Sequence, residues 1–118
     1  MAGQPVVVNF WFPSCPPCRA EMPDLQEAYT EFKDRGVQFV GVQQLGIDSK
    51  DDAIAFLEEV GVEYPNIPDE NAAIQLEYRI LSYPTTVFLD SNHDIAKKWN
   101  GLITKEDLRE QIESIAGS

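Results

Sequence analysis

Positively charged residues are scarce in this chain of 118 residues. Nine lysines and arginines stand against twenty aspartates and glutamates, so the formal net charge is −11. Proteins that bind nucleic acid do so largely through basic surfaces, so this balance argues against a nucleic-acid partner. The acidity favours solubility, with a preference for basic partners as the alternative.

Long apolar runs are also absent. No stretch approaches the roughly 18 to 20 apolar residues of a membrane-spanning helix. The opening MAGQP lacks the basic and apolar regions of a secretory signal. A hydrophobic content of 43% over 118 residues is enough for one core and too little for two. We therefore expect a single domain over residues 1–118, without a membrane span and monomeric.

Metal-ligating side chains are few: two cysteines, Cys15 and Cys18, and one histidine, His93. A structural zinc site needs about four ligands, so no metal and no cofactor is expected. A disulfide closing so short a loop would stabilise the fold little. A reactive redox pair is the favoured interpretation, and half a metal site and a structural crosslink stay as alternatives. His93 is expected in a solvated turn without a role, and Trp11 and Trp99 in the core or on the sheet.

The pattern of apolar residues alternates between strand and helix. The run PVVVNFWF (5–12) is typical of a strand buried on both faces. The residues after it carry an apolar stripe that ends near Gly36, and Pro23 should kink that helix. The further elements expected are a strand over 37–44, a helix capped by Ser49, a link over 62–70, a short helix over 71–78, a hairpin over 85–90 and 95–101, and a helix capped by Thr104. In the second helix, Ile54, Phe56 or Leu57, and Val60 should face inward. Together these strands and helices predict an α/β fold, in which helices cover both faces of one sheet.

The two cysteines then lie at the start of the first helix, beyond the carboxyl end of a central strand, where α/β sheets collect their chemistry. A helix N-terminus stabilises a thiolate. Cys15 should be the exposed nucleophile, and Cys18, one turn further on the apolar stripe, the buried thiol that resolves a mixed disulfide. Pro16 and Pro17 fit the first turn, where a missing N–H costs nothing.

Three segments, VVVNFWFPSCPPCRAEMPDL, YPTTVFLD and the insert between them, resemble the TlpA/ResA type of thiol-disulfide oxidoreductase in the thioredoxin superfamily, within the AhpC/TSA/Redoxin-like proteins. The resemblance covers essentially the whole chain. It implies a thioredoxin-like fold with a central mixed sheet, and a redox-active Cys15–Cys18 disulfide.

The resemblance also implies site residues beyond the cysteines. The Tyr83–Pro84 bond should be cis, and its loop should face the cysteines and help to hold an extended substrate. Ser14, Pro16, Tyr83 and Thr85 are the substrate-binding candidates. Plain thioredoxins place a buried aspartate where this chain has Asn9, so the proton acceptor for Cys18 should come from elsewhere. Asp48 and Glu21 are the two candidates, with a loop carboxylate and a helix-surface carboxylate as the structural alternatives.

The chain departs from the family at two points. Relatives usually carry a tryptophan directly before the first cysteine, where this chain has Ser14, so the surface around Cys15 is altered. The family's N-terminal hairpin and membrane anchor are missing, and we expect a truncated or processed chain.

The function predicted is thiol-disulfide exchange with protein substrates, in the reducing direction, of the kind that serves cytochrome c maturation. Its partners would be protein thiols and disulfides, with a membrane or soluble thiol reductant as electron donor. An extracytoplasmic location is expected, with the cytoplasm as alternative. The rival functions are a general thioredoxin-like reductase, a thiol peroxidase, and a non-enzymatic binding module or chaperone. A peroxidase would need a threonine three residues before its cysteine, and Phe12 stands there.

Overall fold

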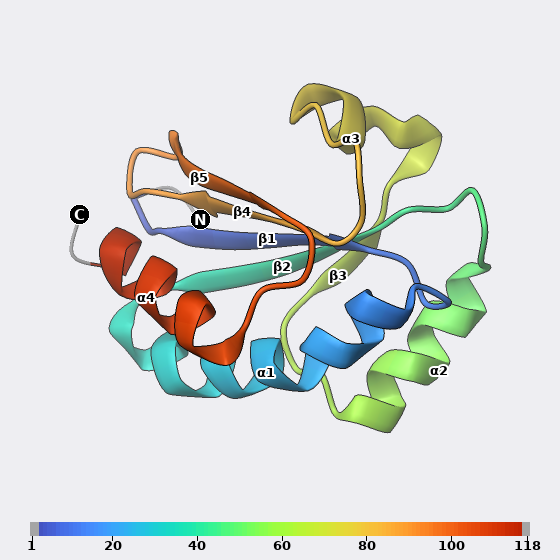
Figure 1. Cartoon of the computed structure of the whole chain (residues 1–118), viewed down its shortest axis with the longest axis horizontal. Coiled ribbons are helices and arrows are strands. Elements are labelled where there is room, and N and C mark those ends of the chain that lie inside the picture. The colour runs from blue at the N-terminus through green and yellow to red at the C-terminus, as the bar shows by residue number, and fades with distance from the viewer. Residues whose placement is uncertain (1–2, 117–118) are drawn as a thin grey trace.

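A computed structural model describes residues 3–116 (Figure 1). The strands are β1 (Val6–Trp11), β2 (Gln38–Gln43), β3 (Asn66–Pro68), β4 (Thr85–Leu89) and β5 (Ile95–Asn100). The helices are α1 (Pro16–Phe32), α2 (Lys50–Val60), α3 (Ala73–Glu77) and α4 (Lys105–Ala116), with short 3₁₀ turns at Lys33–Arg35 and Glu70–Ala72. The predicted order of strands and helices is confirmed, and the predicted link over 62–70 contains β3.

The five strands form one mixed sheet in the order β3-β2-β1-β4-β5. β1 pairs in parallel with β2, which pairs in parallel with β3, while β4 runs antiparallel to both β1 and β5. All six residues of β1 are buried, as its nearly unbroken apolar run predicts for a central strand. The carboxyl end of β1 therefore opens in the middle of the sheet edge, directly before the cysteines.

Helices cover both faces of the sheet, as predicted. Figure 1 shows α3 on one side and α1, α2 and α4 on the other. One core cluster joins Trp11 and Phe88 to the helices α1, α2 and α4. A smaller cluster on the opposite face joins Phe10 and Val87 to Ile74 and Tyr78 at α3. The helix that carries the cysteines thus packs on the larger core.

The buried stripe of α2 differs from the prediction in one residue. Ile54 is 54% exposed, whereas Ala53 and Phe56 are buried and Leu57 and Val60 are half-buried. These four positions are spaced i, i+3, i+4 and i+7, which places Ile54 beyond the edge of the stripe. The other local signals hold: Ser49 and Asp52 form a capping box at the start of α2, and Gly36 ends the turn after α1 with a φ of 82°.

Asp69 fixes the start of α3. Its side chain is buried, and its carboxylate accepts the backbone N–H groups of Ile74 and Gln75 at 2.8 and 2.9 Å. These are N–H groups that a helix start leaves without an intrahelical partner. The carboxylate therefore holds this short helix against the sheet.

We predict that Asp69→Ala lowers the free energy of unfolding by about 1–2 kcal/mol, the usual cost of losing a helix cap. Urea titration of the oxidised protein would measure the change. Asp69→Asn, which keeps one acceptor oxygen, should cost less. Equal losses in the two variants would contradict a capping role.

Candidate active site

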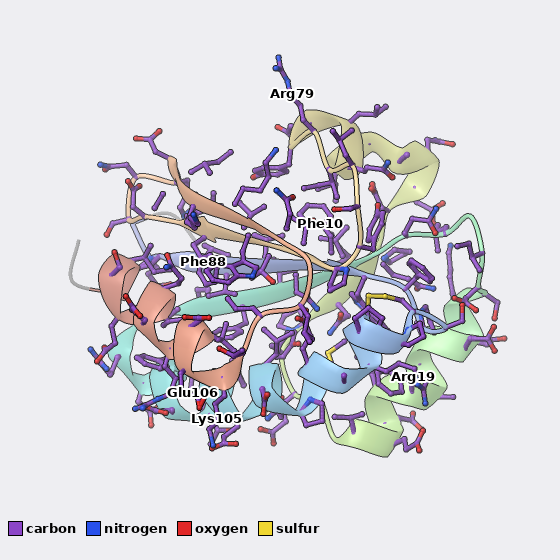
Figure 2. All side chains as sticks on the ribbon, in the orientation of Figure 1. Phe10, Arg19, Arg79, Phe88, Lys105 and Glu106 are labelled. Carbon is purple, nitrogen blue, oxygen red and sulfur yellow. A yellow bond between two sulfur atoms is a disulfide. The ribbon has the colours of Figure 1, made fainter. Side chains whose placement is uncertain are left out.

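The two cysteines form a disulfide at the start of α1, visible as the yellow bond in Figure 2. Cys15 is the N-cap residue with an extended backbone, and Pro16 and Pro17 occupy the first two helical positions. The backbone N–H of Cys18 donates to Cys15 Sγ at 3.3 Å. The positive end of the helix is therefore directed at the Cys15 sulfur, the arrangement that stabilises a thiolate once the bond is reduced.

One expectation about the pair is wrong for the disulfide state. Cys15 was predicted to be exposed, but it is only 3% accessible, and Cys18 is completely buried as predicted. Both belong to the main core cluster, against which Phe12 and Tyr83 also pack. The sulfur of Cys15 is bonded toward Cys18 on the buried face, while its neighbours Ser14 and Pro16 remain exposed.

Glu21 lies one turn after Cys18 on the same buried face of α1. It is 1% exposed, which rules out the alternative of a helix-surface carboxylate. Its Oε2 accepts the backbone N–H of Ile103 at 3.1 Å, and its Oε1 has no hydrogen-bond partner within residues 3–116.

Burial raises the pKa of Glu21 from 4.5 to about 7, because a carboxylate loses its hydration in the core. The Ile103 N–H opposes this shift, and the charge of Asp24 adds to it. Burial, with the nearby Glu21, also raises the pKa of Tyr64. Glu21 can therefore take up or release a proton near neutral pH beside the cysteine pair.

Two further buried polar residues belong to this face and were not predicted as part of the site. Asn9 and Thr86 stand opposite each other on β1 and β4. The side-chain amide of Asn9 and the hydroxyl of Thr86 are buried without a partner among the described residues. A polar residue inside the apolar run of β1 was the available signal for Asn9, and nothing in the sequence distinguished Thr86 from an ordinary strand threonine.

The loop before β4 confirms the prediction of a cis peptide bond between Tyr83 and Pro84. The Tyr83 ring packs edge-on against Phe12, with ring centroids 5.7 Å apart. Since Phe12 leads into Cys15, this loop lies beside the cysteine segment, as the resemblance implied.

Thr85 does not occupy the position expected for a substrate-binding side chain. It is completely buried, and its hydroxyl donates to the Ser82 carbonyl at 2.8 Å. Its strand position also pairs with Phe10 on β1 and with Asn100 on β5. The Thr85 side chain therefore supports the loop from within the sheet, and a contact with substrate through the Thr85 backbone stays a prediction.

The segment before β4 is tied to α3 through a bond that the sequence did not indicate. The hydroxyl of Tyr83 donates to Gln75 Oε1 at 2.9 Å. Burial raises the pKa of Tyr83, and the charge of Asp69 adds to the shift. The helix α3 thus supports the cis-proline loop.

Asp48 lies at the turn before Cys15, hydrogen-bonded to Ser14. Its Oδ2 accepts both the backbone N–H and the hydroxyl of Ser14, at 3.0 and 2.8 Å, on the exposed surface. Cys18 is fully buried. The structure therefore brings Glu21 to the Cys18 side of α1 and Asp48 to the turn before Cys15, so Asp48 does not fit the predicted role of acceptor for the Cys18 proton.

Among residues 3–116, no three His, Cys, Asp or Glu side chains gather as metal ligands, and no helix is long and apolar enough to cross a membrane.

Comparison with known proteins agrees with this geometry. The sequence model of the AhpC/TSA family matches residues 1–98. The chain belongs to this family. It is 34% identical over 116 residues to the thiol-disulfide oxidoreductase ResA of Oceanobacillus iheyensis, and 34% identical over 117 residues to ResA of Geobacillus kaustophilus. These matches cover 98% and 96% of this chain, but 59% and 64% of the two relatives, so the chain spans less than two thirds of their length.

Solved structures show the same fold. A secreted thiol-disulfide isomerase from Corynebacterium glutamicum superposes with a TM-score of 0.88 at 27% identity, covering 99% of this chain and 73% of that one. StoA from Bacillus subtilis gives a TM-score of 0.83 at 27% identity, covering 95% and 84%. A thioredoxin-family thiol:disulfide interchange protein from Chlorobium tepidum gives 0.88 at 25% identity, covering 98% and 81%. The predicted thioredoxin-like fold is thus confirmed.

Proposed function

We propose that the protein is a thiol-disulfide oxidoreductase that exchanges its Cys15–Cys18 disulfide with cysteines of protein substrates. The observation that carries the proposal is the disulfide itself, formed by both cysteines of the chain at the N-terminus of α1 and beside the cis-proline loop. The ResA relatives support it, since each is named a thiol-disulfide oxidoreductase and is 34% identical to nearly the whole of this chain.

In the reducing direction, the Cys15 thiolate attacks one sulfur of a substrate disulfide, and the other substrate sulfur leaves as a thiolate. Cys18 then attacks Cys15 Sγ, which releases the first substrate sulfur and closes the Cys15–Cys18 disulfide. Two electrons pass from the cysteine pair to the substrate. A thiol reductant, membrane-bound or soluble, returns them by the reverse exchange.

Glu21 is the proton acceptor for Cys18 in this scheme. Cys18 must lose its proton before it attacks, and it is buried away from water. Residues three apart on a helix have Cβ atoms about 5–6 Å apart, so Glu21 lies within one side-chain length of the Cys18 thiol. A carboxyl group with a pKa of about 7 exchanges protons efficiently near neutral pH.

We further propose that the protein acts as a reductant outside the cytoplasm, in cytochrome c maturation or related thiol repair. One structural neighbour is a secreted thiol-disulfide isomerase, which supports this compartment. The net charge of −11 supports the direction, because acidic surroundings oppose strong stabilisation of a thiolate.

The direction is tested by the reduction potential. We expect the Cys15–Cys18 couple to equilibrate with glutathione or dithiothreitol at roughly −200 to −270 mV, in the reducing half of the range for thioredoxin-like proteins. Alkylation of the free thiols followed by mass spectrometry measures the reduced fraction. A potential near the oxidising end, at roughly −120 mV, would overturn the reducing role.

A further inference from the structure

The turn that precedes Cys15 is held in place by two side chains that lie outside it. Ser14 gives both its backbone N–H and its hydroxyl to Asp48 Oδ2, from the loop between β2 and α2. Arg19 Nη1 donates to the Pro13 carbonyl at 3.1 Å. Within the turn, the Cys15 N–H donates to the Phe12 carbonyl at 3.1 Å.

Arg19 connects this turn to α2 as well. Its guanidinium carbon lies 4.1 Å from the centre of the Phe56 ring, and its Nη2 is 4.0 Å from Glu59 Oε2. Figure 2 shows Arg19 at the α2 side of α1. The segment over α2 and the loop before it therefore fix the turn from one side, while the cis-proline loop packs on Phe12 from the other.

The bond to Asp48 depends on the residue at which this chain departs from the family pattern. The hydroxyl of Ser14 supplies the shorter of the two hydrogen bonds. Both bonds end on a single carboxylate oxygen, one residue before the attacking cysteine. The carboxylate thus brings a negative charge close to Cys15 and at the same time fixes the backbone that carries it.

We propose that Asp48 is a positioning residue that acts through Ser14 on Cys15, holding the nucleophile's turn and making the couple more reducing. This inference rests on the proposed thiol-disulfide exchange. The physical reason is that a nearby negative charge disfavours the Cys15 thiolate, so it disfavours the reduced form relative to the disulfide. Two substitutions separate the effect of the hydrogen bonds from the effect of the charge. Asparagine keeps the acceptor oxygen and removes the charge, whereas alanine removes both.

The test compares Asp48→Asn and Asp48→Ala in the full chain, with Asp52→Asn as the control. Asp52 lies at the start of α2 and lines the same surface hollow as Ser14 and Asp48, but its carboxylate accepts from the Ser49 N–H and not from Ser14. Its substitution therefore removes a comparable nearby charge without touching the hydrogen bonds to the turn. For Asp48→Asn we expect the equilibrium with glutathione to shift about two- to fivefold toward the reduced protein, which is about 10–20 mV. Exchange of the Ser14 amide hydrogen should stay within about twofold of wild type, because asparagine still accepts from it.

For Asp48→Ala we expect the same shift in potential and, in addition, an approximately tenfold faster exchange of the Ser14 amide hydrogen, a loss typical of one hydrogen bond to a charged group. Asp52→Asn should shift the potential less than Asp48→Asn does, and it should leave the Ser14 exchange at the wild-type rate, because its carboxylate accepts from Ser49 and not from Ser14. The proposal is overturned if Asp48→Asn leaves the potential unchanged, if Asp52→Asn shifts it equally, or if Asp48→Ala leaves the Ser14 exchange at the wild-type rate.

Failure of this inference is distinguishable from failure of the proposed function. The potential is measured on the cysteine pair itself and needs no substrate. If wild type does not reduce a protein disulfide such as that of insulin, the proposed function fails while the comparison among variants still decides the role of Asp48.

Discussion

Replacing Cys18 by serine is expected to convert the protein into a trap that stays covalently bound to its substrates through Cys15. The Cys15 thiolate still attacks a substrate disulfide, but a serine hydroxyl does not displace the substrate sulfur, so the mixed disulfide persists. Insulin reduction should stop at one equivalent or less per protein molecule. Non-reducing electrophoresis and mass spectrometry would show the adduct.

Cys15→Ser is the matched control, because it keeps the helix and the second cysteine. We expect it to abolish insulin reduction and to form no adduct, since Cys18 is completely buried one turn further into α1, whereas Cys15 lies at the helix start beside the exposed Ser14 and Pro16. Reduction that survives Cys15→Ser would favour the binding-module rival over the proposed enzyme. Consumption of peroxide without added thiol partner by wild type would favour the peroxidase rival, and we expect none.

Glu21→Gln is expected to remove a large pH dependence from the stability of the oxidised protein. The folded protein holds the Glu21 proton more tightly than the unfolded chain does, because its pKa is about 7 in place of 4.5. The stability that this residue contributes is fully present below about pH 4.5 and is lost as the pH rises toward and through 7. The difference of 2.5 pKa units amounts to about 3 kcal/mol.

Urea titrations at pH 5 and pH 8 would measure this effect as the difference between wild type and Glu21→Gln, which cancels the titration of the other carboxylates. The variant should gain about 2.5 kcal/mol on wild type between these two pH values, slightly less than the full effect because pH 5 already lies above the unfolded pKa of 4.5. Glu110→Gln changes the same charge on the exposed side of α4 and should show no such gain. An equal difference between wild type and Glu21→Gln at both pH values would show that the Glu21 carboxyl is not perturbed by burial.

The order of strands and helices was predictable because its signals are local. The β-branched run before the cysteines predicts a buried strand, Ser49 and Thr104 cap the helices that follow them, and Gly36 ends a turn. Where the prediction failed, at Ile54, the error was one position on a helix surface. The spacing of apolar residues predicts which side of a helix is buried. It does not predict how wide the buried surface is, because that depends on the elements that pack against the helix.

The functional residues divide in the same way. The cysteine pair and the cis-proline were predicted from a compact motif and a family resemblance, and both are found in the structure. The roles of Asp48 and Glu21 were left open between alternatives. Glu21 accepts a hydrogen bond from Ile103, 82 positions away, and Asp48 accepts two from Ser14, 34 positions away. No local pattern specifies such partners.

The sequence by itself determined the helix start that carries Cys15 and Cys18, because the proline pair and the preceding strand restrict the backbone over a few residues. Only the tertiary structure decided which carboxylate is buried and which is exposed. The packing of α1 on the sheet removes water from Glu21 and raises its pKa, while the loop before α2 keeps Asp48 at the surface beside Ser14. Burial is a property of the assembled core, and it separates two carboxylates whose roles the sequence left open.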